Sequence, residues 1–446
     1  MTTMKKHEEN FYKFSDDLYS SLSEGEDLTL SLHLEDTFFA RFNQAKVRQT
    51  TSVVEGELGL SFVRGKKKIE YNVGYTGDRE VDLAAATVAL KECQALAPNL
   101  MDDPFCPDTI NNGTSSENHT ATLPSHESSM EKVLTPASSY DLAGIYTSGW
   151  VVRANTNSKG QKHWFSTESC SMDYSLYTAK QRAVKGMYAT TNWSDEEYQQ
   201  NISGQLAQLE LMDREKKIVP RGKYRVYLSP GAVSEIVGII NWQGLSYSCF
   251  KQGRSAFKKM SDENLKLSEK FSLSEDFSLG MTARFNNLGE QAPERLALID
   301  QGVLENYLVS SKASKEYGVE SNFANQQESM RSPNMSTGDL KREDILKEIG
   351  TGLYLSNLHY LNWSDIRHGR ITGMTRFACF WVEDGEIISP IQDMRFDENM
   401  YHFFGDGLKR VTDFSEIAPN TSTYGHRSIG GMKTPGVIVD DFSFTL

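Results

Sequence analysis

Residues 229–240 read SPGAVSEIVGII, and this stretch decides the fold. The preceding segment, KYRVYL at 223–228, alternates apolar and polar side chains as a strand does, and it leads the chain to Pro230. From there the apolar side chains are frequent enough to indicate a helix that enters a core. A strand followed directly by such a helix indicates a mixed architecture, and a single carboxylate, Glu235, lies within the apolar run.

Glu235 is the first candidate for a functional residue. Its neighbours Val233, Ile236 and Val237 are apolar, so the sequence predicts a carboxylate surrounded by core residues. Carboxylates are rarely buried unless they are paired, bind a metal or act in catalysis. The helix around Glu235 is therefore the best place to look for a site.

Composition narrows the class of protein. At 446 residues the chain exceeds the size that one core supports, so two domains are expected. The net charge of −13 argues against nucleic acid as a partner, because such proteins present a basic face to the phosphates. No apolar run is long enough for a membrane span. The five scattered cysteines lack a C-x-x-C spacing and favour a reducing compartment, so we expect a cytoplasmic protein.

The order of segments predicts two α+β domains, residues 1–220 and 221–446. The first has strands over 28–75, a helix that begins after Asp78, and further antiparallel strands before a polar helix at 195–214. The segment at about 99–140 is rich in Ser, Thr and Asn, and is expected to be a long polar loop.

The second domain is expected to be mainly antiparallel sheet with packed helices. Residues 296–309 and 377–391 read as hairpins, the second strongly because Asp384-Gly385 suits a two-residue turn. Between them, Asp339 is expected to cap a helix over 340–349.

The order Ser-Glu-Ile-Val-Gly-Ile at 234–239 resembles the His-Glu-x-x-Gly-His helix of the TldD/PmbA metallopeptidase family, with both histidines replaced. The Gly-Thr-Gly and Phe-Trp-Val-Glu-Asp-Gly-Glu-Ile stretches near the C-terminus are the most specific further matches. Together the similar segments cover nearly the whole chain: they are residues 39–68, 155–178, 221–233, 348–358 and 371–387.

The resemblance implies a zinc site whose ligands are replaced in this chain. In the active branch two histidines of the helix and a cysteine near the C-terminus hold zinc, and the glutamate activates water. The corresponding positions here are Ser234, Ile239 and Tyr424, so no metal is expected in this chain. The retained Glu235 is either a relic base or peptide contact, or a structural residue that caps the backbone or pairs with a basic side chain.

A substitute metal site is not favoured by the remaining histidines. No pair among those of the C-terminal half has the i, i+4 spacing of a helical zinc motif; they are His359, His368, His402 and His426.

By this resemblance the chain is a non-catalytic PmbA (TldE)-like subunit that pairs with a zinc-bearing TldD-like subunit. Such complexes enclose a chamber in which unfolded peptides bind as an added strand and are cut. Two alternatives remain: an autonomous peptidase with an unrecognised metal site, and a non-enzymatic interaction protein like the gyrase modulators after which the family was described. The sequence is also compatible with a homodimer.

Overall fold

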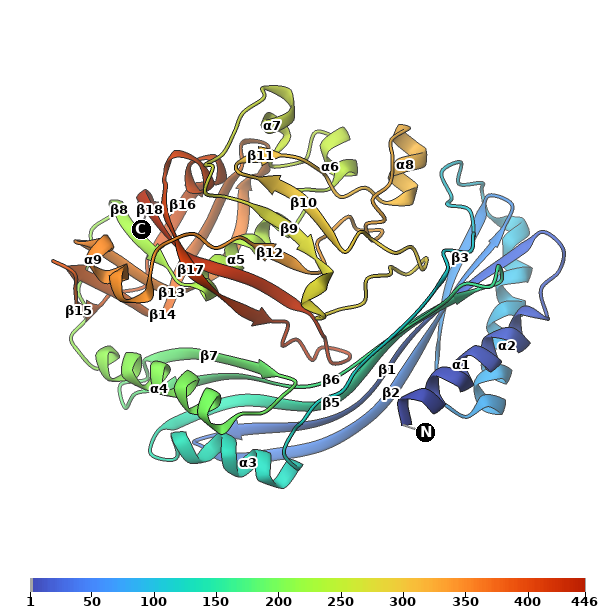
Figure 1. The fold of residues 1–446 in the computed structure, drawn as a ribbon, viewed down its shortest axis with the longest axis horizontal. Coiled ribbons are helices and arrows are strands. Elements are labelled where there is room, and N and C mark those ends of the chain that lie inside the picture. Colours follow the sequence, from blue (N-terminus) through green and yellow to red (C-terminus); the bar gives the residue numbers. More distant parts are fainter. Residues whose placement is uncertain (1–2, 446) are drawn as a thin grey trace.

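A computed structural model describes residues 3–445, which form two β-sheets with helices packed against them (Figure 1). In this part of the chain the first sheet has seven strands in the order β3-β2-β1-β5-β6-β4, with β7 paired to β6. All its pairs are antiparallel except β4 with β6. The strands are β1 (Glu26–Asn43), β2 (Lys46–Arg64), β3 (Lys67–Gly74), β4 (Thr114–His119), β5 (Asp141–Asn157), β6 (Lys162–Tyr177) and β7 (Ala183–Thr190).

The first sheet has one apolar face and one polar face, because side chains alternate along each strand. On β1, Leu28, Leu30, Leu32 and Leu34 are buried on the side covered by helices, whereas Ser31, His33, Glu35 and Thr37 share the opposite side, called here the polar face. The four helices lie on the outer side of the sheet, and the second sheet lies over the polar face (Figure 1). They are α1 (Thr3–Tyr19), α2 (Arg79–Leu96), α3 (His126–Leu134) and α4 (Asp195–Met212).

Local signals placed the start of α2 correctly. The Asp78 carboxylate accepts hydrogen bonds from the amides of Glu80 (3.0 Å) and Val81 (3.2 Å), as expected of an N-cap.

The expectation of one long loop at about 99–140 is wrong in part, because the segment contains β4 and α3. Strand β4 joins the sheet through backbone pairing with β6, and four of its six side chains are exposed, so it carries no hydrophobic pattern. Helix α3 buries only Ser129 and Val133 among its own residues, and Ser125 caps its N-terminus. The polar composition therefore gave no signal for β4 and α3, because both depend on contacts with neighbouring elements.

The second sheet has eleven strands in the described residues, in the order β11-β10-β9-β12-β18-β16-β14-β13-β8. Strand β15 pairs with β14, β17 with β18, and β8 pairs with both β13 and β18, so that β8, β13, β14, β16 and β18 close into a ring. The bounds are β8 (Gly222–Leu228), β9 (Leu273–Asp276), β10 (Arg295–Asp300), β11 (Val303–Leu304), β12 (Pro333–Met335), β13 (Gly352–Asp365), β14 (Arg370–Glu383), β15 (Glu386–Pro390), β16 (Arg395–Asn399), β17 (Leu408–Pro419) and β18 (Gly431–Phe444).

Both predicted hairpins are present. Gln301 and Gly302 join β10 to β11, and Asp384 (φ 49°) with Gly385 (φ 79°) joins β14 to β15, as the two-residue turn requires. The fold class, α+β with mainly antiparallel sheets and packed helices, is confirmed.

The expected helix over 340–349 is shorter than predicted. Its α-helical part is α9 (Ile345–Ile349), preceded by a 3₁₀ turn at Arg342–Asp344. Asp339 is not its cap, because the side chain lies outside both turns and pairs with Arg410 instead.

Helix α5 (Pro230–Asn241) follows β8 directly and packs against β13 and β18. The Ser229 hydroxyl accepts a hydrogen bond from the Ala232 amide (3.3 Å) and donates one to Ser356 O (2.6 Å), which fixes the start of the helix against β13. The other helices are short: α6 (Tyr247–Lys251), α7 (Lys258–Asp262) and α8 (Ser311–Tyr317). The five cysteines are buried free thiols.

Candidate functional site

Glu235 lies on the exposed side of α5, so the prediction of a carboxylate surrounded by core residues is wrong. The helix buries its other side, where the apolar residues of the run pack into the core of the second sheet. An apolar run of this kind does not say which side chain faces outward, because that depends on where the sheet lies. The buried residues are Ala232, Val233, Ile236, Val237 and Ile240.

The environment of Glu235 is nevertheless partly desolvated. Desolvation raises the pKa of this carboxyl, and Lys185 opposes that effect. Lys185 lies on β7 and forms an ion pair with Asp173 of β6, which in turn accepts a hydrogen bond from Thr421 Oγ1 (3.0 Å). The exposed face of α5 therefore looks toward the polar side of the first sheet. Within residues 3–445 the Glu235 carboxylate makes no hydrogen bond or ion pair, so neither structural role expected for it is observed.

Two of the three expected ligand positions flank Glu235 on α5. Ser234 is 7% exposed and donates a hydrogen bond to Gly231 O (2.7 Å), while Ile239 is 7% exposed and belongs to the core. Between them, Gly238 leaves open space at the helix surface. Tyr424 is 97% exposed in the loop before β18, so the structure does not pack it against the other two positions.

The histidines of the C-terminal half do not form a cluster. His368 contacts Asp365 (Nδ1 to Oδ2, 2.7 Å), and His402 contacts Glu398 (Nδ1 to Oε1, 3.0 Å). His426 lies beside His33, with the two rings tilted and their centroids 4.1 Å apart. In the part of the chain that the structure describes, no group of three His, Cys, Asp or Glu side chains is arranged to hold a metal ion.

The pKa of Glu235 predicts a pH-dependent effect of substitution. Because the folded protein holds this proton more tightly than the unfolded chain, whose pKa is near the ordinary value of 4.5, the stability contributed by the protonated form is lost as the pH rises above that value. Glu235→Gln should therefore raise the urea midpoint at about pH 7 and leave it unchanged at about pH 4. The exposed Glu210→Gln on α4 controls for general loss of charge, and equal shifts in both variants would contradict this account.

The loop at 420–430, called here the docking loop, connects the two sheets and was not foreseen from the sequence. Arg427 is 3% exposed and donates hydrogen bonds to Gly149 O (3.1 Å), Ser169 O (2.9 Å) and Ser169 Oγ (2.8 Å) on β5 and β6. Its backbone amide donates to Glu35 Oε1 (3.0 Å) on β1. A cation buried against a sheet of the other half of the chain is a tertiary feature without a local sequence signal.

A second connection is the turn at 285–289. Phe285 stacks on His163 with ring centroids 5.2 Å apart, and the side chains of Asn155 and Gln161 donate hydrogen bonds to the backbone oxygens of Asn287 (2.8 Å) and Leu288 (3.0 Å).

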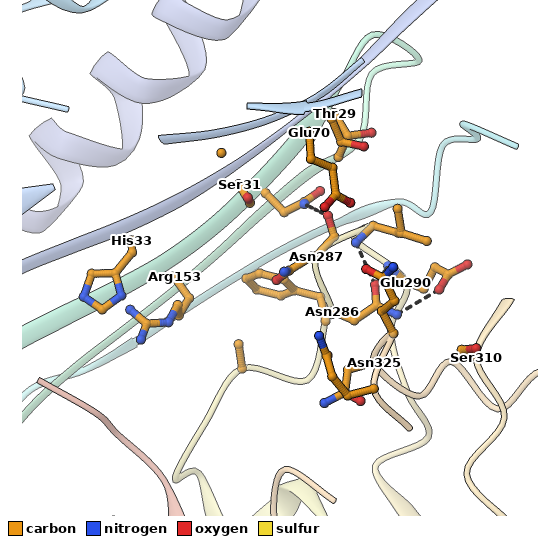
Figure 2. Close-up of a pocket in the computed structure, with 18 of the residues that line it drawn as sticks. Thr29, Ser31, His33, Glu70, Arg153, Asn286, Asn287, Glu290, Ser310 and Asn325 are labelled. Carbon is orange, nitrogen blue, oxygen red and sulfur yellow. Dashed lines mark hydrogen bonds between the residues drawn. The ribbon is translucent and has the colours of Figure 1, made fainter. Parts of the chain in front are cut away.

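Two cavities lie along the polar face of the first sheet, and the docking loop contributes a residue to each. One, of about 770 Å³, is lined by strand residues near Arg41 and Asp173 and by Thr421. The other, of about 570 Å³, lies between β1, β2, β3 and β5 and the loops of the C-terminal half, and His426 is part of its wall. Figure 2 shows His33 and Arg153 close together on one side of this second cavity, with Asn286, Asn287 and Asn325 on the other.

Burial lowers the pKa values of two basic groups at this second cavity, His33 and Arg153. It lowers the pKa of His33 to about 3, with Arg153 and His426 adding to the effect, so His33 is neutral at neutral pH. It also lowers the pKa of Arg153 to about 10, against the opposing influence of Glu35, which leaves the guanidinium charged.

Comparisons with known proteins define the class to which this fold belongs. Residues 221–446 match the family model described as "PmbA/TldA metallopeptidase C-terminal domain". Because this match spans more than half of the chain, the protein belongs to the PmbA/TldD metallopeptidase family.

Three solved structures share the fold along nearly all of the chain. TldE from Thermococcus kodakarensis has a TM-score of 0.77 at 13% identity, covering 99% of this chain and 100% of that one. A putative modulator of a DNA gyrase from Thermotoga maritima MSB8 has a TM-score of 0.76 at 16% identity, covering 98% and 100%. A putative modulator of DNA gyrase from Bacteroides thetaiotaomicron VPI-5482 has a TM-score of 0.75 at 16% identity, covering 99% and 98%.

No curated protein sequence matches the chain. Among residues 3–445, no helix has both the length and the apolar character needed to cross a bilayer.

Proposed function

We propose that this chain is the PmbA/TldE-like, non-catalytic subunit of a cytoplasmic TldD/TldE-type metallopeptidase complex. A TldD-like partner subunit holds the zinc and cuts unfolded peptides, while this chain completes the chamber and helps to hold the peptide. The function of the complex is the maturation or breakdown of peptides.

The observation that carries the proposal is the chemistry of the three expected ligand positions. A serine hydroxyl is a poor zinc ligand and an isoleucine side chain is none, whereas structural and catalytic zinc sites use imidazole, thiolate or carboxylate. Ser234 also has its hydroxyl engaged by Gly231 O, and Tyr424 faces solvent. Glu235 alone keeps the family residue type, on the exposed side of α5.

The position of α5 supports a role at a chamber wall. Its exposed side faces the polar side of the first sheet, where the 770 Å³ cavity and the Lys185–Asp173 pair lie. Strand edges and polar side chains suit a peptide that is held through its backbone, which gives affinity with little sequence selectivity.

The test is metal content and peptide hydrolysis of the purified chain, alone and mixed with a TldD-like subunit from the same organism. We expect no zinc and no cleavage from the chain alone, with cleavage in the mixture above that of the TldD-like subunit by itself. Stoichiometric zinc with cleavage by the chain alone would overturn the proposal in favour of an autonomous peptidase. A mixture in which the two subunits neither associate nor gain activity would favour an interaction protein. The molecular mass of the purified chain in solution tests for a homodimer.

Restoring the ligands should restore zinc affinity. The variant Ser234→His, Ile239→His, Tyr424→Cys is expected to bind zinc in a calorimetric titration in which the unaltered chain gives no signal. Peptide hydrolysis would also need neighbouring side chains that hydrogen-bond the new ligands and orient them. The matched control, Ser234→Ala, Ile239→Ala, Tyr424→Ser, changes the same positions without supplying donors. A folded triple variant that takes up no zinc would contradict the placement of the site.

A further inference from the structure

The 570 Å³ cavity carries a row of three side chains across neighbouring strands of the polar face. In the strand register His33 of β1 is paired with Glu57 of β2 on one side and with Arg153 of β5 on the other. Paired residues project from the same face of a sheet, and all three line the cavity. An acid and a base are therefore separated by a histidine that is neutral at neutral pH.

Neither end of this row has a charged partner within the protein. Among residues 3–445, Glu57 and Arg153 take part in no ion pair, and the only hydrogen bond from the Arg153 side chain goes to Val152 O (3.1 Å). The carboxylate that acts on the pKa of Arg153 is Glu35, which forms no ion pair with it. Glu35 accepts hydrogen bonds from Thr37 Oγ1 (2.6 Å) and the Arg427 amide (3.0 Å).

Most of the other charges around the cavity have partners, but Arg331, which also lines it, makes no ion pair among residues 3–445 and lies over the Phe277 ring, 4.6 Å from its centroid. Lys68 pairs with Glu70 (2.7 Å), and Lys312 pairs with Asp103 (2.7 Å). Glu290 accepts a hydrogen bond from Asn286 Nδ2 (2.8 Å) and one from Ser311. The row itself thus offers one carboxylate and one guanidinium without an ion-pair partner, between walls that carry amide side chains (Figure 2).

The spacing of the two charges in the row selects a class of ligand. Glu57 and Arg153 are two strands apart, so their Cα atoms are separated by about 10 Å. An extended peptide advances by about 3.3–3.6 Å per residue, so the two charged termini of a tripeptide are separated by a similar length, about 10 Å. A single amino acid is too short to reach both groups.

We propose that this cavity binds short free peptides of about three residues by their two charged ends. The C-terminal carboxylate lies on the Arg153 guanidinium, which can donate two parallel hydrogen bonds to it as a bidentate pair. The N-terminal ammonium lies on the Glu57 carboxylate, and the wall amides of Asn287 and Asn325 hydrogen-bond the peptide backbone. A cavity of 570 Å³ is within the usual range for small-ligand sites.

The site is separate from the α5 surface and does not depend on the proposed peptidase role. Its residues come mainly from β1, β2, β3 and β5 and from the loops and α8 of the C-terminal half, and none of the positions on α5 lines it. Peptide binding by the purified chain tests this site alone, whereas hydrolysis in a mixture with a TldD-like subunit tests the proposed function, so either can fail without the other.

The experiment is calorimetric titration of the full chain with trialanine, N-acetyl-trialanine and trialanine amide. We expect trialanine to bind. Each capped peptide should bind at least tenfold more weakly, because acetylation removes the charge of the N-terminus and amidation removes that of the C-terminus. The comparison needs no variant, so it stands even if a substitution disturbs folding. Failure of trialanine to bind at millimolar concentration, or equal binding of all three peptides, would overturn the proposal.

Two variants test which side chain binds each end of the peptide. In Glu57→Gln, free and acetylated peptides should bind equally, and in Arg153→Met, free and amidated peptides should bind equally. Glu55→Gln is the matched control, because Glu55 is exposed on the same face of β2 two residues away and does not line the cavity. If Glu55→Gln weakens the binding of trialanine as much as Glu57→Gln does, the assignment of the peptide's ammonium group to Glu57 is wrong. Arg153→Lys, which keeps the charge, is expected to retain part of the affinity that Arg153→Met loses.

Discussion

Replacement of Arg427 by methionine is expected to lower the free energy of unfolding by about 3 kcal/mol or more. Methionine retains much of the apolar volume but donates nothing, so the three hydrogen bonds to Gly149 and Ser169 are lost. Each buried acceptor left without its charged donor costs about 1–3 kcal/mol. Glu35, 1% exposed, also loses a nearby positive charge.

The measurement is urea unfolding of both proteins, followed by circular dichroism. Arg342→Met serves as the control, because Arg342 is 67% exposed and its contact with Glu416 (3.0 Å) is a surface ion pair worth less than about 1 kcal/mol. Faster proteolytic cleavage within the docking loop should accompany the loss of Arg427. Coincident unfolding midpoints for the two variants would show that Arg427 does not hold the two sheets together.

Substitution of Gly149 by alanine should have an effect of similar size for a different reason. Gly149 on β5 has φ 140°, and a Cβ atom there would lie 2.0 Å from Asp36 O and 3.0 Å from Asp36 C. Both are backbone atoms of the paired strand β1, so relief requires the strands to separate. Strain and overpacking each cost about 1–3 kcal/mol, and we expect a loss of about 3 kcal/mol.

Gly204→Ala is the matched control for this substitution. Gly204 lies within α4, and a Cβ atom there meets nothing within 4 Å. Alanine should stabilise a helix interior by about 0.5–1 kcal/mol relative to glycine. The two Gly→Ala variants should therefore shift the thermal midpoint in opposite directions, and a Gly149→Ala variant as stable as Gly204→Ala would refute the steric argument.

Features fixed by neighbouring residues were predictable from the sequence. The cap at Asp78 and the Asp384-Gly385 turn each depend on a few adjacent residues, and both were placed correctly. Strand β4 was missed because its stability comes from backbone pairing with β6, which lies more than 40 residues further along the chain. Asp339 fits the N-cap pattern equally well, but Arg410 of β17 engages it.

The candidate site was predicted in part. The helix was found, yet the outward direction of Glu235 depends on how α5 packs on β13 and β18. The row of Glu57, His33 and Arg153 becomes visible only when the register of three strands is known, since the residues are 24 and 120 positions from the middle one. Arg427 lies three residues after the predicted position Tyr424, but its burial depends on strands of the other half.

The order of the strands along the chain also bears on how the protein forms during synthesis. Every element of the first sheet and the four helices that cover it lies before residue 213, whereas β8 needs β18, at Gly431–Phe444, to close its ring. At about 5–20 residues per second, translation of the intervening stretch takes about 10–50 s. During that interval the first sheet can form with its own helices on its apolar face, and Ala378 and Phe380 of β14 later complete the apolar cluster around α4. Most of the surface that waits for the second half is the polar face, which has less tendency to aggregate than an apolar face of the same size.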